Sequence, residues 1–206
     1  DIITMEVPAY LEKRKVQYPE KVIADFLAKE LIVGVFIGRA EWGPRALGNR
    51  SILCAATKKN VTEELNRRLN RSDFMPFAPI CLEEDVQRIF PRYSSGSPMA
   101  AKYMTITTEV GQDVLQQFPA IVHIDKTARP QIVSCTQNPF ISEVLHEYKN
   151  YAGVGILLNT SFNLHETPIV EEPDDAIDVL IKNGVDVVCF NNWIVYNPRV
   201  LEKYEL

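Results

Sequence analysis

Apolar residues recur at helical spacing in several segments of the chain. In residues 19–30 they fall on one face, and Pro19 suits the first turn of a helix. Asp174 and Asp175 open the segment 173–183, where acidic side chains favour the helix dipole. The pattern predicts helices over residues 19–30, 61–69, 83–90, 138–151 and 173–183.

Short apolar runs and alternating segments predict strands between these helices. The apolar runs are 31–37, 51–56, 154–158, 186–190 and 193–196, and the segment 74–82 is apolar with prolines, which indicates an irregular strand. Residues 102–110 alternate as a strand does, and 121–124 with 129–134 predict a hairpin around 125–128. Residues 38–50 and 91–101 are expected to be a turn and a loop, and a polar turn is expected at 159–163.

Because helices and strands intermingle throughout, we predict one mixed α/β domain over residues 1–206. The order of the strands in the sheet is left open by this pattern. A composition of 46% hydrophobic and 24% charged residues excludes a disordered chain, a collagen-like chain and a coiled coil.

Charge is unevenly distributed along the chain. The whole chain carries a net charge of −5, which argues against a general nucleic-acid binder. Residues 39–71 nevertheless hold eight basic and three acidic side chains, a local charge of +5. An acidic protein with one basic segment suggests a site for a small anion.

The ends and the metal-binding residue types point to a cytoplasmic protein without a metal cage. No apolar run approaches the ~20 residues that span a bilayer, and the N-terminus does not have the pattern of a signal peptide. The four cysteines are far apart, and the three histidines have no metal-ligand spacing. We therefore expect reduced, buried thiols.

The segment 38–51, GRAEWGPRALGNRS, concentrates the candidate chemistry. It follows a predicted buried strand, and its glycines allow the backbone to approach a ligand closely. Arg39, Arg45 and Arg50 suit bidentate contacts to phosphate or carboxylate. The segment has neither the Walker A nor the GxGxxG pattern, so it predicts a generic oxyanion site. A solvated loop with unrelated charges is the alternative.

Three further polar clusters fit the same chemistry. Arg71 precedes the Pro-bracketed stretch 74–79, and Arg129 lies in the segment 127–131, TARPQ. Residues 159–163, NTSFN, offer donors and acceptors for a nucleotide or a metal-bound phosphate. The alternatives are a solvated helix end, a hairpin turn and a polar turn that satisfies its own backbone. Because no nucleophile–base set is evident, the residues predict binding of a phosphorylated small molecule and electrostatic stabilisation of phosphoryl or acyl transfer.

Taken together and in this order, the motifs at 38–51, 74–79, 127–131 and 158–163 resemble the C-terminal domain of the O-carbamoyltransferases. These enzymes modify nodulation factors, cephalosporins and aminoglycosides in biosynthetic pathways. The resemblance covers roughly residues 30–195. It implies a YrdC-like fold, a twisted mixed sheet flanked by helices, with a core at 31–197 and about 30 residues of linker and helix before it.

The resemblance also implies an activity. The domain would bind carbamoyl phosphate and ATP with Mg2+ and form carbamoyl adenylate. A Kae1/ASKHA-like N-terminal domain, absent from this chain, would carry a metal and transfer the carbamoyl group to an acceptor hydroxyl. The alternatives are a threonylcarbamoyl-adenylate synthase and a non-catalytic module that binds nucleotide or docks a partner.

Carried over residue by residue, the motifs give a set of expected site residues. The expected catalytic residues are Arg45, Arg50 and Arg71. The expected substrate- and nucleotide-binding residues are Arg39, Asn49, Ser51, Arg129, Asn159, Thr160, Ser161 and Asn163. Many members have Lys where this chain has Leu69, so Arg68 is a candidate substitute. Many also read Gly-Glu-Pro at 166–168, which leaves the role of Glu166 open.

Overall fold

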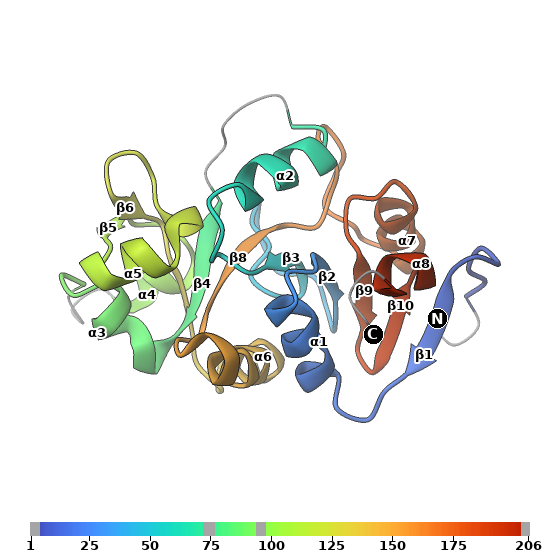
Figure 1. Ribbon diagram of the computed structural model, residues 1–206, viewed down its shortest axis with the longest axis horizontal. Coiled ribbons are helices and arrows are strands. Elements are labelled where there is room, and N and C mark those ends of the chain that lie inside the picture. The colour runs from blue at the N-terminus through green and yellow to red at the C-terminus, as the bar shows by residue number, and fades with distance from the viewer. Residues whose placement is uncertain (1–4, 72–76, 94–97, 203–206) are drawn as a thin grey trace.

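The computed structural model describes residues 5–71, 77–93 and 98–202, and its centre is a mixed sheet (Figure 1). The sheet has eight strands in the order β1-β10-β9-β2-β3-β8-β4-β7. β2 runs parallel to β9 and β4 parallel to β7, and the other neighbours are antiparallel. The strands are β1 (Glu12–Lys15), β2 (Val33–Phe36), β3 (Arg50–Cys54), β4 (Ala78–Leu82), β7 (Gln131–Val133), β8 (Ile156–Ser161), β9 (Val187–Phe190) and β10 (Trp193–Tyr196).

Helices cover both faces of the sheet, as the amphipathic patterns predict. In Figure 1, α1 (Pro19–Ala28) and α6 (Pro139–Ala152) lie below the sheet, and α2 (Val61–Arg68) and α7 (Pro173–Ile181) lie above it. Leu157 of β8 packs in the core between the sheet and helices α1 and α6, whereas Leu158 packs in the core between the sheet and helices α2 and α7. Successive side chains of β8 therefore face opposite sides of the sheet.

The end of β8 is held against the centre of the sheet by Phe162. The Phe162 ring occupies the space that a Cβ would take at Gly34 of β2. The Phe162 N–H donates to the carbonyl of Arg50, at 2.9 Å. These contacts place the polar segment that ends β8 beside the start of β3.

Short elements lie beyond β4, at one end of the molecule in Figure 1. They are η1 (Glu83–Asp85), α3 (Val86–Ile89), α4 (Pro98–Lys102), β5 (Thr108–Glu109), α5 (Gln112–Gln117), η2 (Pro119–Ile121) and β6 (Thr127–Ala128). A last short helix, α8 (Pro198–Leu201), follows β10. None of the described helices has the length and apolar composition needed to cross a membrane.

The strand predicted over residues 102–110 is wrong, and so is part of the loop predicted before it. α4 occupies Pro98–Lys102, and only Thr108–Glu109 are extended. The backbone N–H and the hydroxyl of Thr105 both donate to the carbonyl of Ala100, at 3.0 and 2.7 Å, and Met104 has a φ of 56°. These local bonds end the helix in a turn, which leaves no room for the predicted strand.

The hairpin predicted around residues 125–128 is also wrong. The turn itself exists, because the N–H of His123 donates to the carbonyl of Thr127 at 2.8 Å. Its flanks, however, pair elsewhere: β6 with β5, and β7 in parallel with β4. Alternation shows that a segment is half-buried, but it does not show which strand it pairs with.

Candidate functional site

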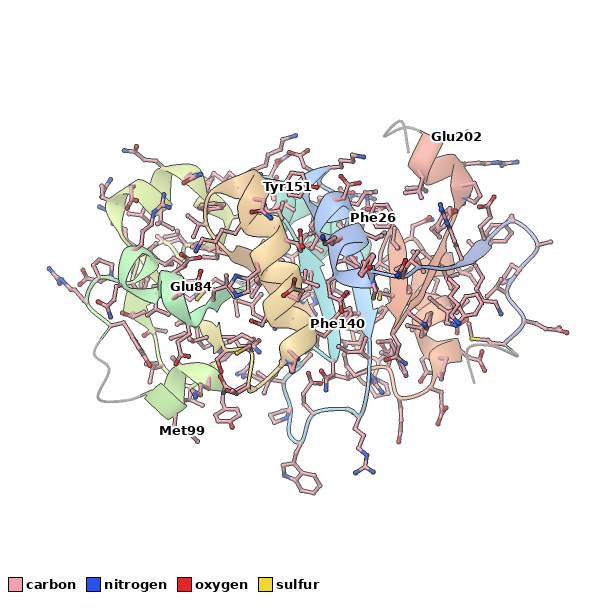
Figure 2. The ribbon with its side chains drawn as sticks, turned by 90° about the horizontal axis from the view of Figure 1, so that it is seen from below. Phe26, Glu84, Met99, Phe140, Tyr151 and Glu202 are labelled. Atoms are coloured by element: carbon pink, nitrogen blue, oxygen red, sulfur yellow. The ribbon has the colours of Figure 1, made fainter. Side chains whose placement is uncertain are left out.

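The loop between β2 and β3, residues 38–49, is called the arginine loop below. The Ile37 N–H closes its base by donating to the carbonyl of Asn49 at 3.0 Å. Gly48 has a φ of 125°, and a Cβ there would lie 2.7 Å from Ile141 Cγ1 and 2.8 Å from Asn138 Nδ2. Glycine at this position lets the loop lie against the start of α6. In Figure 2 the loop extends past the end of α6 that carries Phe140.

Glu41 holds the arginine loop from within. Its Oε1 accepts the backbone N–H of Leu47 at 2.8 Å and that of Asn49 at 2.6 Å. The Asn49 amide is also used inside the protein: Nδ2 donates to the Arg39 carbonyl at 2.8 Å, and Oδ1 accepts from Asn138 at 3.0 Å. The structure therefore places Asn49 as a tie within the loop.

Arg50, the first residue of β3, braces the base of the loop. It is buried, and its guanidinium donates to the carbonyls of Ile37 at 2.7 Å and Gly38 at 3.1 Å. Its Cζ lies 3.6 Å from the centroid of the Phe36 ring. Burial lowers the pKa of Arg50, and its Nε has no hydrogen-bond partner among the described residues.

Arg45 and Arg129 come from separate motifs, and the positive charge of Arg45 acts on Arg129. Arg45 is exposed on the arginine loop, and Arg129 is half-buried after β6. Burial lowers the pKa of Arg129, and the nearby positive charge of Arg45 lowers it further. Within the described ranges neither guanidinium has a salt bridge, and Nε of Arg129 is buried without a partner. The two guanidinium groups, which have no counterion in the described residues, form a candidate site for an anion. Arg39 is exposed on the same loop.

Asn159 and Gln131 pin the arginine loop to the sheet. Asn159 Nδ2 donates to the Ala46 carbonyl at 3.2 Å and to Gln131 Oε1 at 2.7 Å, and Gln131 Nε2 donates to the Leu47 carbonyl at 2.6 Å. Both amides are buried. Gln131 was not among the expected site residues, although it stands two positions after Arg129 in the TARPQ motif.

Arg71 and Thr160 lie on the other face of the sheet. Arg71 donates to Thr160 Oγ1 at 3.1 Å, and its Cζ is 5.5 Å from the centroid of the Phe77 ring. Burial lowers the pKa of Arg71. Because β8 continues to Ser161, the turn predicted from residue 159 begins later, and strand alternation separates Thr160 from Asn159. The candidate residues thus surround the end of β8 on both faces. Residues 74–76 of the predicted 74–79 motif lie outside the described residues.

Ser51, Ser161 and Asn163 complete the expected set. Ser51 of β3 lies opposite Ser161 of β8, and Ser51 Oγ accepts the Gly48 N–H at 2.9 Å. Asn163 Nδ2 donates to two carbonyls of its own turn, each at 2.8 Å. The bonds of Asn163 follow the alternative of a turn that satisfies its own backbone, whereas Ser161 stands at the open end of the strand.

Arg68, the candidate substitute for a lysine, is engaged away from these residues. Its guanidinium bonds to Glu64 at 2.6 Å and to Asp186 at 2.7 Å. The other oxygen of Asp186 accepts the Ile32 N–H at 2.8 Å. Arg68 therefore ties α2 to the starts of β2 and β9.

The remaining titratable residues offer no metal cage within the described part of the chain. No three His, Cys, Asp or Glu side chains there are grouped closely enough to hold a metal ion. All four cysteines are free thiols; Cys135 is exposed and the others are buried. The expectation of buried thiols is thus wrong for Cys135.

Comparison with known proteins points to one family. Residues 24–197 match the family described as "Carbamoyltransferase C-terminus". Nodulation protein U of Rhizobium tropici is 42% identical over 180 residues, which are 87% of this chain and 30% of that protein. An uncharacterized protein of Methanocaldococcus jannaschii is 37% identical over 180 residues, 87% of this chain and 29% of that protein. The chain thus spans about 30% of the length of these relatives.

Solved structures share the fold at low sequence identity. Full-length HypF in its phosphate- and nucleotide-bound form aligns with a TM-score of 0.56 and 16% identity, over 88% of this chain and 22% of that chain. Sua5 of P. abyssi complexed with L-threonine aligns with a TM-score of 0.59 and 9% identity, over 86% and 48%. The YrdC-like fold predicted from the motifs is confirmed.

Proposed function

The chain belongs to the carbamoyltransferase C-terminus family, and on that premise we propose that it binds carbamoyl phosphate and Mg·ATP around the end of β8 and forms carbamoyl adenylate. The relatives are about three times longer, and in this proposal transfer to an acceptor hydroxyl belongs to another part of such an enzyme. The observation that carries the proposal is the Arg45–Arg129 pair, two neighbouring cations without a counterion in the described residues.

The two faces at the end of β8 suit two substrates. On the arginine-loop side, Arg45 and Arg129 would hold the phosphate of carbamoyl phosphate, with Arg39 close by on the loop. On the other side, Arg71 and Thr160 would contact the nucleotide. Ser161, the last residue of β8, lies at the strand end where the two sides meet. That HypF has been solved with phosphate and nucleotide supports a site for both in this fold.

The proposed chemistry needs no protein nucleophile. Water cleaves carbamoyl phosphate to carbamate and inorganic phosphate. A carbamate oxygen then attacks the α-phosphorus of ATP, the bond from that phosphorus to the bridging oxygen breaks, and pyrophosphate leaves. The guanidinium groups would neutralise charge on the phosphoryl oxygens as the bonds change. In this proposal Mg2+ enters as part of the nucleotide substrate.

Pyrophosphate release tests the proposal and separates it from the alternatives. With Mg·ATP, the protein should release pyrophosphate when carbamoyl phosphate is added, and threonine with bicarbonate should not replace it. Release that depends on threonine would instead identify a threonylcarbamoyl-adenylate synthase. Calorimetric binding of ATP without any carbamoyl phosphate binding or turnover would identify a nucleotide-binding module.

A further inference from the structure

We propose that Glu41 is a positioning residue, whose carboxylate shapes the arginine loop and thereby sets the position of Arg45. The inference rests on the proposed function, because it assigns a role within the same anion site. A single carboxylate oxygen of Glu41 accepts hydrogen bonds from the backbone N–H groups of Leu47 and Asn49, at 2.8 and 2.6 Å. The carboxylate therefore connects the first part of the arginine loop to its last residues.

Two carbonyls of the same stretch of the loop accept hydrogen bonds from donors on the sheet. Gln131 and Asn159 donate to the carbonyls of Leu47 and Ala46. Glu41 accepts the N–H groups on the same stretch. Donors from the sheet and an acceptor within the loop thus specify one conformation from both sides.

The charge of Glu41 supports this role. An acidic side chain among the loop arginines disfavours an anionic ligand, so direct contact with the ligand does not account for it. The Glu41 carboxylate accepts the hydrogen bonds of the Leu47 and Asn49 N–H groups, which would otherwise be available to an anion. The incoming phosphate is then directed to the arginine side chains.

A loop shaped before binding also loses less conformational freedom when the ligand binds. Without the Glu41 acceptor, the stretch from Gly43 to Gly48 would keep glycine freedom at both ends, with φ values of 114° and 125° in the structure. Arg45 lies within this stretch. Loss of the carboxylate should therefore misplace Arg45 while the sheet stays folded.

Three variants test the inference: Glu41→Ala, Glu41→Gln and, as a matched control, Glu63→Ala on the exposed surface of α2. Glutamine keeps a carbonyl oxygen able to accept both N–H groups but removes the charge. Amide hydrogen exchange of the ligand-free protein reports the shape of the loop. Calorimetry with carbamoyl phosphate, and separately with inorganic phosphate, reports the affinity of the site.

In Glu41→Ala, the amides of Leu47 and Asn49 should exchange at least about tenfold faster, with unchanged exchange in β3 and β8. The same variant should bind carbamoyl phosphate about tenfold or more weakly. Glu41→Gln should restore wild-type exchange and bind at least as tightly as wild type, and Glu63→Ala should match wild type in both measurements.

Two results would overturn the role of Glu41. One is unchanged exchange and affinity in Glu41→Ala. The other is tighter anion binding in Glu41→Ala, which would make the carboxylate a competitor for the ligand. A wild-type protein that binds neither anion refutes the proposed function instead, and the exchange of the ligand-free variants still decides whether Glu41 shapes the loop.

Discussion

Replacing Arg45 by alanine should have effects of opposite sign on stability and on ligand binding. Arg45 is exposed, and its charge acts on Arg129 without a counterion in the described residues. Removing it relieves a like-charge interaction in the ligand-free protein. Because solvent and salt screen this interaction, the gain in unfolding free energy should be small, about 0.5 kcal/mol or less.

Binding should change by much more. Loss of charge-assisted hydrogen bonds from Arg45 to a phosphate should weaken carbamoyl phosphate binding at least tenfold, or about 1.4 kcal/mol. At a ligand concentration of 100 times the wild-type Kd, wild type should gain about 2.7 kcal/mol of stability from the ligand. The variant should then gain only about 1.4 kcal/mol or less.

Thermal unfolding with and without ligand measures both effects together. Each kcal/mol corresponds to about 2–4 °C in Tm for a domain of this size. Arg199→Ala, on the exposed surface of α8, removes the same charge away from the site and serves as the control. The reasoning is refuted if Arg45→Ala lowers the ligand-free unfolding free energy by more than about 1 kcal/mol. It is also refuted if the variant keeps the full ligand-induced shift.

Three further predictions concern the fold. Asp186→Ala leaves the buried N–H of Ile32 without its acceptor and removes one of the two carboxylate partners of the half-buried Arg68. It should cost about 1–3 kcal/mol in urea unfolding, and a loss under about 0.5 kcal/mol would contradict this. Hydrogen bonds from Arg67 and Arg68 lower the pKa of Glu64 to about 2, so its stabilising contribution is complete above pH 4.5 and is lost as pH falls towards 2. Glu64→Gln should flatten this acid limb of the stability profile, and an unchanged limb would rule the explanation out. Ellman's reagent should label one thiol in the native protein, that of the exposed Cys135. Burial raises the pKa of the other three thiols, which are Cys54, Cys81 and Cys189. Rapid labelling of a second thiol would contradict this prediction.

Local patterns predicted the long elements of the fold well. α1, α6 and α7 each carry an apolar face with proline near the first turn, and each is a helix at the expected place. The apolar runs at 31–37 and 51–56 became β2 and β3. These elements depend on periodicity within one segment, which a single sequence carries.

Elements that depend on distant partners were predicted poorly or missed. β1 reads EKRK, without an apolar run, and is a strand because it pairs with β10 at the edge of the sheet. The alternating segment 102–110 is mostly irregular because Thr105 bonds back to Ala100. Pairing and local capping decide such segments, and neither is visible in hydrophobic spacing.

The candidate site shows the same division. Motif order predicted that Arg45 and Arg129 belong to one site, and in the structure the charge of Arg45 acts on Arg129. The spacing did not show that the amides of Asn159 and Asn49 bond to and within the arginine loop, because these bonds join residues that are distant in the sequence or depend on how the loop folds back. The residue types indicated which side chains are polar. Only the fold shows which of these side chains bond within the protein and shape the loop, and which remain available to a ligand.

The most direct test of the proposed activity is the fate of the carbamoyl carbon. The protein is incubated with carbon-13-labelled carbamoyl phosphate and Mg·ATP, quenched rapidly and analysed by mass spectrometry, with Arg45→Ala in parallel. We predict labelled carbamoyl adenylate and an equal amount of pyrophosphate with wild type, and a strongly reduced yield with the variant. Labelled carbamate without any adenylate, or equal yields from both proteins, would contradict the account.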